Sequence, residues 1–209
     1  MLIFPLVVGQ LQTNCYLVGD ETTKQGLVVD PGDDTDLILQ KLQEEQLEPQ
    51  ALVATHGHFD HIMAVLELQL ALGIPFWVHQ KDEFLVKRMR STAQHFVGTD
   101  PGPAPKIDGF LDSAKPLKIG KTRLQIIETP GHTPGGVSFY SLKEKVIFVG
   151  DTFFADGSVG RTDYSYASPK DLQASLDKLL KLPGKTAVYP GHGPETTIAQ
   201  ERFFHQNMG

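Results

Sequence analysis

Runs of apolar residues divide the first quarter of the chain into short β-strands. Branched and aromatic residues fill three segments, separated by turn-forming residues: Ile3–Val8, Asn14–Val18 and Gly26–Asp30. The residues Asp30-Pro-Gly-Asp-Asp34 have the composition of a turn. The pattern therefore predicts that the chain begins with a β-sheet.

Helices and strands are then predicted to alternate. A helix is expected from the spacing of Leu39, Leu42 and Leu47, with Pro49 just after its end. The apolar run Ala51–Thr55 is typical of a short, fully buried strand. The remaining expectations for this half are a helix over Ile62–Leu72 closed by Gly73, a strand over Phe76–Val78, a helix over Asp82–Gln94 and an irregular loop over Gly98–Lys106.

The second half repeats this alternation. The expected elements are a hairpin over Leu117–Thr129, a second hairpin that pairs Gly136–Leu142 with Lys145–Val149, a helix that begins at Ser168-Pro-Lys-Asp171, a last strand over Thr186–Tyr189, and a terminal helix opened by the capping box Thr197-Ile-Ala-Gln200. Two β-rich stretches with helices between them favour two packed sheets covered by helices, in one domain spanning residues 1–209.

Composition and charge narrow the class of protein. The chain has 209 residues, 40% of them hydrophobic and 21% charged, as in ordinary globular domains. Its net charge of -6 disfavours nucleic acid as a partner. No apolar run reaches the roughly 18 to 20 residues of a membrane span, and the start lacks the basic region of a signal peptide. Cys15 stands alone, which excludes an intrachain disulfide and favours a small buried hydrophobe. A cytoplasmic location is expected, with no membrane partner.

Histidines and aspartates gather directly after the strand that ends at Thr55. The sequence there contains His56, His58, Asp60 and His61 within six residues. Residues two apart in an extended segment point the same way, so His56 and His58 can face one position. The following turn can direct Asp60 and His61 toward a neighbouring position. Imidazole and carboxylate groups at this density are typical ligands of zinc or another first-row metal.

Three further candidates each follow a β-rich segment and have a glycine immediately before them: His132, Asp151 and His192. Glycine allows the backbone to pack closely around a site. One carboxylate can bridge two cations, so we predict a two-metal site with a shared aspartate. The first metal is assigned to His56, His58, His132 and Asp151, and the second to Asp60, His61, His192 and Asp151. A single histidine in a strand usually has a packing role, but a clustered set of seven candidates favours metal ligation.

The seven candidates, in this order along the chain, resemble the full ligand series of the metallo-β-lactamase-fold hydrolases. The resemblance implies an α/β fold, a four-layer αβ/βα sandwich of two mixed β-sheets with helices on both outer faces. Asp30 matches the family's early aspartate, which implies support of the ligands from behind rather than direct ligation. Within the superfamily, the chain resembles a short, single-domain form of the glyoxalase II-like branch, the hydroxyacylglutathione hydrolases.

The branch is suggested by Asp151, because the well-known zinc β-lactamases generally place a cysteine ligand at this stage. Cys15 lies far from that place in the ligand order, so β-lactam hydrolysis is not expected. Full-length glyoxalase II carries a further C-terminal helical region that supplies much of its glutathione site. This chain ends at Gly209, soon after His192.

A loop that aligns with the glutathione-binding loop of glyoxalase II contains Arg161, where that family has a basic residue. Asp163 stands where the family has a tyrosine. Two roles for Arg161 therefore stay open, binding of a substrate carboxylate and pairing with Asp163. Tyr164 and Tyr166 follow in the same loop and are candidates for lining a pocket.

The resemblance implies a metal-dependent hydrolase that cleaves a thioester, S-lactoylglutathione or a related hydroxyacyl thioester. Two divalent metal ions are implied, with Zn²⁺ expected first and iron or manganese as alternatives. Water held between two cations should lose a proton near neutral pH and supply hydroxide as the nucleophile. Asp60 is the candidate catalytic residue, because it can both bind a metal and accept a proton. The expected partner is a small-molecule thioester.

Two other functions stay open at this stage. Persulfide dioxygenases of the same fold also resemble the chain, including a Gly-Arg-Thr-Asp loop like Gly160–Asp163. They use a single iron held by two histidines and one aspartate, which here would be His56, His132 and Asp151. A binding module without catalytic activity is the third possibility, and the completeness of the ligand set counts against it.

Overall fold

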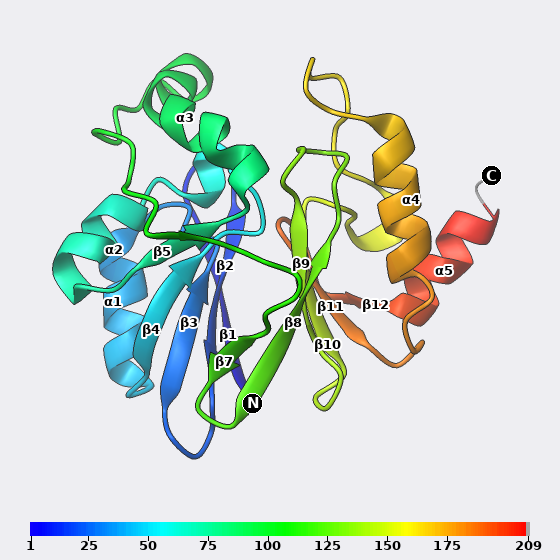
Figure 1. Ribbon diagram of the computed structural model, residues 1–209, viewed down its shortest axis with the longest axis horizontal. Helices are drawn as coiled ribbons and strands as arrows, with labels where there is room; N and C mark the ends of the chain where they lie inside the picture. Colours follow the sequence, from blue (N-terminus) through cyan, green and yellow to red (C-terminus); the bar gives the residue numbers. More distant parts are fainter. Residues whose placement is uncertain (208–209) are drawn as a thin grey trace.

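Two six-stranded β-sheets pack face to face, and helices cover both outer faces (Figure 1). The computed structural model describes residues 1–207. The first sheet has the strand order β1-β2-β3-β4-β5-β6 and the second has the order β12-β11-β10-β9-β8-β7. In Figure 1, α1, α2 and α3 lie outside the first sheet, and α4 and α5 lie outside the second. The expected α/β four-layer sandwich is confirmed.

The first sheet and the helices that cover it consist of β1 (Leu2–Val8), β2 (Thr13–Gly19), β3 (Gln25–Val29), α1 (Thr35–Glu44), β4 (Glu48–Val53), the 3-10 turn η1 (Phe59–His61), α2 (Val65–Leu72), β5 (Phe76–Val78), the 3-10 turn η2 (Gln80–Asp82), α3 (Glu83–Phe96) and β6 (Gly109–Phe110). The second sheet and its helices consist of β7 (Leu117–Ile119), β8 (Thr122–Glu128), β9 (Val137–Ser141), β10 (Val146–Gly150), the 3-10 turn η3 (Ala155–Gly157), α4 (Pro169–Leu179), β11 (Ala187–Pro190), β12 (Thr196–Thr197) and α5 (Ile198–Asn207). Both sheets are mixed, because β3 to β6 run parallel in one and β10 and β11 run parallel in the other.

Strand β2 illustrates how the core is divided between the layers. Cys15 and Leu17 belong to the core beneath α1, α2 and α3, whereas Tyr16 and Val18 belong to the core between the two sheets. Successive side chains of a strand point to opposite faces, so a strand covered on both faces is apolar throughout. Cys15 is a fully buried free thiol, and burial raises its pKa. It packs as a small hydrophobe, as expected.

Most predicted elements are present with small shifts at their ends. The predicted hairpins form β7–β8 and β9–β10. Ser168 caps α4, since its hydroxyl accepts a hydrogen bond from the backbone N–H of Asp171 at 3.2 Å. Thr197 accepts in the same way from the N–H of Gln200 at 3.3 Å. Local cues were sufficient here because the contacts that stabilise caps and hairpin turns are themselves local.

Three local predictions differ from the structure. The strand predicted to be the last, β11, is followed by the short strand β12, which pairs with it antiparallel. Pro49 lies inside β4, where a shift of register opposite Gly26 accommodates the missing N–H of proline. The helix predicted from Ile62 begins only at Val65, because Ile62, Met63 and Ala64 form a turn between η1 and α2. The 3-10 turn η1 just before it carries two of the candidate ligands, Asp60 and His61, where a turn into the helix was expected.

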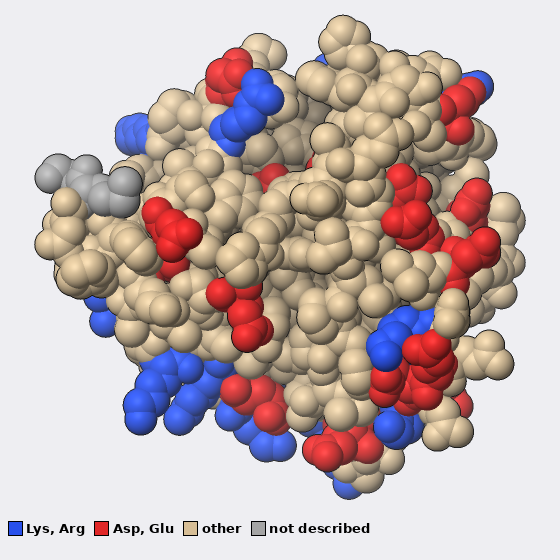
Figure 2. Space-filling view, turned by 180° about the vertical axis from the view of Figure 1, so that it is seen from behind, with Lys and Arg blue, Asp and Glu red and all other residues tan. Residues whose placement is uncertain are grey.

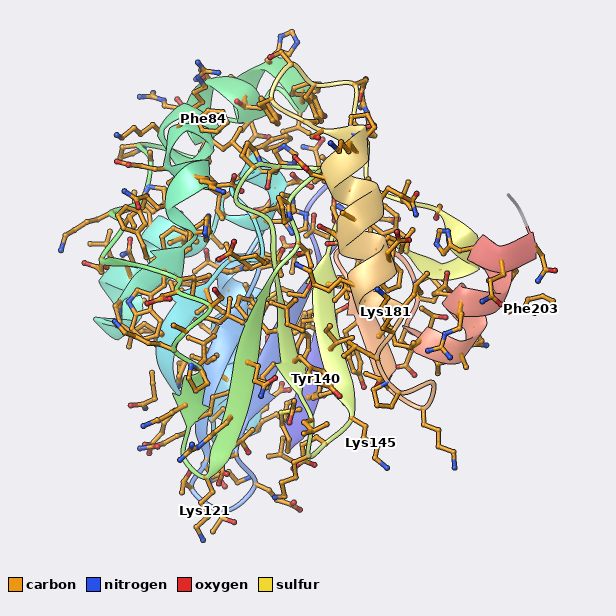
Figure 3. All side chains as sticks on the ribbon, turned by 45° about the vertical axis from the view of Figure 1, so that its right-hand side comes forward. Phe84, Lys121, Tyr140, Lys145, Lys181 and Phe203 are labelled. Carbon is orange, nitrogen blue, oxygen red and sulfur yellow. The ribbon has the colours of Figure 1, made fainter. Side chains whose placement is uncertain are left out.

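The surface carries charges of both signs. On the face shown in Figure 2, basic side chains along the lower edge lie next to acidic ones. Figure 3 shows Phe203 pointing outward from α5, where it is 64% exposed. Among residues 1–207, the helices are all too short or too polar to cross a membrane.

Candidate metal centre

All seven candidate ligands lie together at one end of the two sheets. His56 and His58 follow β4, and His132, Asp151 and His192 follow β8, β10 and β11. Nitrogen and oxygen atoms from these residues, together with Asp60 and His61 from η1, form three overlapping groups in which every donor atom lies within 4.8 Å of the others. The ends of strands from both sheets meet here, so the sandwich brings together residues that are far apart in the sequence.

The first ligand group consists of His56, His58 and His132. His56 Nε2 lies 3.1 Å from His58 Nδ1, and His58 Nδ1 lies 2.9 Å from His132 Nε2. One ring nitrogen of each histidine therefore faces a common point. His56 and His132 are buried and His58 is partly exposed. Three converging imidazole nitrogens are the kind of donor set that zinc, iron and other first-row cations prefer.

The outward nitrogens of this group determine which tautomer is present. His132 Nδ1 lies 2.7 Å from the carbonyl oxygen of Arg161, which can only accept, so Nδ1 carries the proton. The hydroxyl of Thr55 donates to Asp30 Oδ2 at 2.7 Å and therefore accepts from His56 Nδ1 at 3.1 Å. The inward Nε2 atoms of both histidines keep their lone pairs for a cation.

The second ligand group consists of Asp60, His61 and His192. Asp60 Oδ2 lies 3.6 Å from His61 Nε2 and 3.4 Å from His192 Nε2. The outward nitrogens again meet acceptors, since His61 Nδ1 is 3.1 Å from Asp30 Oδ2 and His192 Nδ1 is 3.1 Å from the carbonyl oxygen of Leu11. The His61 contact has the distance of an ion pair but is not aligned as a hydrogen bond. Both groups thus have the same design, with one nitrogen inward and the other supported from behind.

Asp151 lies between the two groups. Its Oδ1 is 3.5 Å from His61 Nε2, and its Oδ2 is 3.6 Å from Nε2 of both His132 and His192. Asp151 Oδ1 and His61 Nε2 are buried and have no hydrogen-bond partner among residues 1–207. Leaving a buried polar atom unpaired typically costs about 1–3 kcal/mol. These orphaned donor atoms fit divalent cations on either side of a shared carboxylate.

The charges of the cluster also favour metal binding. Burial, with the neighbouring histidines, holds the pKa of His56 well below its ordinary value and lowers the pKa of His58 to about 3. Both rings are therefore neutral at pH 7, as ligation requires. Burial also disfavours charge on His61, but the carboxylates of Asp60 and Asp151 outweigh it and raise its pKa to about 10. A proton on His61 and a divalent cation are thus alternative partners for these carboxylates.

All three glycines that precede ligands are closely packed. A Cβ on Gly131 would overlap the backbone of Leu172 in α4, and the other two glycines pack against the site itself. Gly150 has φ 53°, in the left-handed region, and a Cβ there would overlap the side chain of Thr55. A Cβ on Gly191 would overlap Asp151 Oδ1 and come within 2.8 Å of His61 Cε1. Any larger residue at either position would displace a candidate ligand or the residue that supports one.

A model of the metallo-β-lactamase superfamily matches residues 8–192, which contain the whole cluster. The chain belongs to the metallo-β-lactamase superfamily. It is 35% identical over 203 residues to "Hydroxyacylglutathione hydrolase GloC" of Haemophilus influenzae, with 93% of this chain and 92% of that protein covered. Membership of the superfamily supports the prediction of a metal-binding hydrolase. It does not by itself identify the glyoxalase II-like branch.

Solved structures of the superfamily share the fold along nearly the whole chain. The crystal structure of BLEG-1 B3 metallo-β-lactamase has a TM-score of 0.88 at 38% identity, with 96% of each chain covered. The crystal structure of TTHA1623 in a di-iron-bound form has a TM-score of 0.86 at 40% identity, with 95% of this chain and 96% of that one covered. ETHE1 from Myxococcus xanthus has a TM-score of 0.74 at 26% identity, with 100% and 92% covered.

In this member of the superfamily, a cleft of about 420 Å³ reaches the ligand cluster. Its walls are largely aromatic and aliphatic, from Leu11, Phe59, Phe96, Phe154, Val159, Tyr164 and Tyr166. Tyr164 and Tyr166 are stacked, with ring centroids 5.3 Å apart, and both line the cleft. A larger hollow of about 930 Å³ beside Trp77 and Phe110 contains none of the seven candidates. The smaller cleft is the one that has access to the donor atoms.

Arg161 lines this cleft, but its guanidinium is already paired. Nε and Nη2 lie 3.0 Å and 2.6 Å from the two carboxylate oxygens of Asp163, and the guanidinium carbon lies 5.1 Å from the ring centre of Tyr164. Of the two roles considered for Arg161, the structure contains the pairing with Asp163. A role in substrate binding stays a prediction.

Two residues near the cluster were missed by the sequence analysis. Asn14 donates from Nδ2 to the carbonyl oxygens of Pro190 and Gly193, at 3.0 Å and 2.8 Å, and so holds both sides of the His192 loop. Asp82 was predicted only as the start of a helix, yet its carboxylate is fully buried beside the first ligand group. Each contact joins segments far apart in the chain, for which the sequence offers no local signal.

Proposed function

We propose that the protein is a metal-dependent hydrolase that cleaves small thioesters, S-lactoylglutathione or a related hydroxyacyl thioester. The observation that carries this proposal is the position of Asp151 between two ligand groups, within 3.6 Å of a histidine nitrogen from each. The similarity to hydroxyacylglutathione hydrolase GloC supports the thioester class. The open, largely apolar cleft also suits a small organic substrate.

Two divalent cations are proposed as cofactors. His56, His58 and His132 would hold one, Asp60, His61 and His192 the other, and Asp151 both. Bound there, the cations would acidify water and polarise the thioester carbonyl. Zn²⁺ is the expected metal, with iron or manganese as alternatives, and the di-iron-bound form of TTHA1623 supports keeping iron among them. Asp30 would support the ligands from behind, through Thr55 and His61.

Asp60 is proposed to move the proton in this reaction. Its carboxylate lies at the cleft, accepts a hydrogen bond from Thr13 Oγ1 at 3.3 Å and lies 3.4 Å from His192 Nε2. Burial alone would raise the pKa of Asp60, but His61 and His192 outweigh it and hold the pKa below its usual range. The carboxylate is therefore ionised at neutral pH and able to accept a proton. A thiolate is a good leaving group, so no separate strong acid is needed.

A second candidate function is persulfide dioxygenation with a single iron held by His56, His132 and Asp151. The observation in its favour is that His132 Nε2 lies 3.6 Å from Asp151 Oδ2 and His56 belongs to the groups of both residues. The complete second ligand group favours the hydrolase, because a single-iron site would leave it without a role.

β-Lactam hydrolysis belongs in the test as well. The ligand order of the sequence disfavours this reaction, but the likeness to BLEG-1 B3 metallo-β-lactamase extends over nearly the whole chain. The expectations of a cytoplasmic location, and of no nucleic-acid or membrane partner, stay predictions.

The deciding experiment pairs metal analysis of protein purified without added metal with three assays. These are hydrolysis of S-lactoylglutathione, oxygen uptake with glutathione persulfide, and hydrolysis of a chromogenic β-lactam. Thioester cleavage by protein that holds two metals per chain supports the proposal. Oxygen uptake at one iron per chain would instead establish the second candidate, and cleavage of the β-lactam alone would assign the site to that chemistry.

A further inference from the structure

Asp82 is a buried carboxylate that lies beside the first ligand group without belonging to it. It lies where η2 meets α3, just beyond β5, and its side chain is fully buried. Oδ2 accepts hydrogen bonds from Gly57 N at 2.9 Å and from Thr133 Oγ1 at 2.7 Å, and Oδ1 accepts from Gly135 N at 2.6 Å. One carboxylate thus binds two separate loops.

Those two loops carry the three histidines of the first ligand group. Gly57 lies between His56 and His58, and Thr133 directly follows His132. The fit is close, since a Cβ on Gly57 would come within 3.0 Å of Asp82 Cβ. A Cβ on Gly135 would come within 2.7 Å of the carboxylate carbon. Both loops are therefore packed directly against Asp82.

Each of the three groups that Asp82 contacts is a hydrogen-bond donor, which explains why a carboxylate is needed. Asparagine has nearly the same shape, but one of its two terminal atoms is an NH₂ group. That NH₂ would face an N–H or O–H donor, and a buried donor would lose its acceptor. The substitution Asp82→Asn therefore removes the link while changing the volume very little.

The bases of the two loops have a separate connection. The backbone N–H of Val137 donates to the carbonyl oxygen of Thr55 at 2.8 Å, independently of Asp82. Loss of the carboxylate should therefore loosen the loops around the histidines without separating β4 from β9.

We propose that Asp82 is a positioning residue that sets the distance between His132 and the pair His56 and His58, and so the metal affinity of the first ligand group. The inference depends on the metal centre proposed above, because it concerns how that centre is held. The second ligand group is attached to η1 and to the loop after β11, neither of which Asp82 contacts through these hydrogen bonds. The effect should therefore be confined to one of the two metal positions.

The test is a titration of metal-free protein with Co²⁺, followed by visible absorbance, in wild type and Asp82→Asn. His58→Ala and His192→Ala identify which binding step belongs to which group. We expect Asp82→Asn to weaken the first-group step by about ten-fold or more, the range found for residues that orient metal ligands. The second-group step should stay within about two-fold of wild type, since its ligands are held by other contacts.

A matched control is available at the opposite end of the sheets. Asp20 is also a buried carboxylate that joins two turns, since it accepts from the backbone N–H groups of Thr23 and Lys121 at 2.9 Å and 3.0 Å. Figure 3 shows Lys121 at the lower end of the molecule. Asp20→Asn should leave both Co²⁺ binding steps unchanged. An effect seen only in Asp82→Asn is then specific to Asp82 and is not a general result of losing a buried carboxylate.

A second pair of variants guards against misfolding of Asp82→Asn. Thr133→Val removes one of the three donors and should weaken the first-group step, whereas Thr133→Ser keeps the hydroxyl and should restore it. Wild-type affinity in both Asp82→Asn and Thr133→Val, or equal weakening of the two steps, would overturn the positioning role. If wild-type protein binds Co²⁺ at neither group, the proposed metal centre itself fails, a result that is distinct from either of these.

Discussion

Nε2 of His58 lies 2.9 Å from the phenol oxygen of Tyr166, a residue 108 positions further along the chain. This contact turns Nδ1 of His58 toward His56 and His132. When Nε2–H donates to the phenol, Nδ1 keeps the lone pair that a cation needs. Tyr166 therefore completes the support of the first ligand group, which Thr55 and Arg161 provide for the other two histidines.

Tyr166→Phe should weaken metal binding at the first ligand group by about ten-fold, since it removes the acceptor that orients His58. The ring should stay in place, because it contacts Tyr164 and Phe84 with centroids 5.3 Å and 5.5 Å away. Co²⁺ titration measures the affinity, and Tyr164→Phe is the control for loss of a hydroxyl from the same stack. Equal affinities in wild type and Tyr166→Phe would show that the hydrogen bond has no orienting role.

The metal content should be close to two per chain. Six candidate ligands in two groups, with Asp151 between them, provide places for two cations. Prolonged dialysis against a chelator should abolish activity and lower the melting temperature, because the metals bind the folded chain and not the unfolded one. Metal analysis and thermal unfolding, before and after re-addition of Zn²⁺, check this. Full activity at one metal per chain would contradict it.

Substitution of individual ligands should distinguish Asp151, which both metals would share, from ligands that hold one metal only. Asp151→Ala should abolish binding of both metals and turnover, since it removes the only carboxylate placed between the groups among residues 1–207. His61→Ala and His192→Ala should chiefly empty the second position. The measurements are metal content and kcat for each variant. Retention of full activity by both histidine variants would rule out the two-metal mechanism.

Arg161→Ala should raise KM roughly ten-fold for anionic thioesters and leave uncharged ones nearly unchanged, if the guanidinium binds a substrate carboxylate. Its pairing with Asp163 provides a matched variant. Asp163→Asn frees the guanidinium and should lower KM for the same anionic substrates. The measurement is kcat/KM for S-lactoylglutathione and for an uncharged thioester in all three proteins. Equal losses on both substrates in Arg161→Ala would mean that the residue supports the loop.

Asp20 should make stability depend on pH in the acid range. Hydrogen bonds from Thr23 and Lys121 outweigh burial and hold the pKa of Asp20 below its usual range. The stability it contributes is therefore present above the unfolded-state pKa of about 4 and is lost as the pH falls below it. The difference in melting temperature between wild type and Asp20→Asn should narrow from pH 6 to pH 3. A constant difference would show that the shift is absent.

The order of elements could be predicted because its causes are local. The cap at Ser168 and the hairpin turn at Gly120 depend on residues within a few positions of one another. The helix predicted from Ile62 begins three residues late, because Ile62, Met63 and Ala64 form a turn between η1 and α2. The backbone N–H of Ala64 in this turn donates to the carbonyl oxygen of Pro31 at 3.1 Å, a contact between distant segments that the local apolar pattern does not report.

The candidate ligands were also accessible to sequence analysis, whereas the groups that hold them were not. Histidine and aspartate directly after apolar strands are rare enough to indicate a site, and a glycine before His132, Asp151 and His192 adds to the signal. Asn14 and Asp82 have no such signal. Asn14 contacts Gly193 across 179 positions of the chain, and an isolated asparagine in a strand does not indicate its partner.

The sequence by itself indicated which side chains are candidates to bind metal and in which order the strands deliver them. Only the tertiary structure decided which nitrogen of each histidine faces inward, that Asp151 lies between the two groups, and that Asp82 joins the two loops of the first group. The physical reason is that ligand identity depends on the chemistry of single residues. Ligand orientation depends instead on hydrogen bonds between segments that only the packing of two sheets brings together.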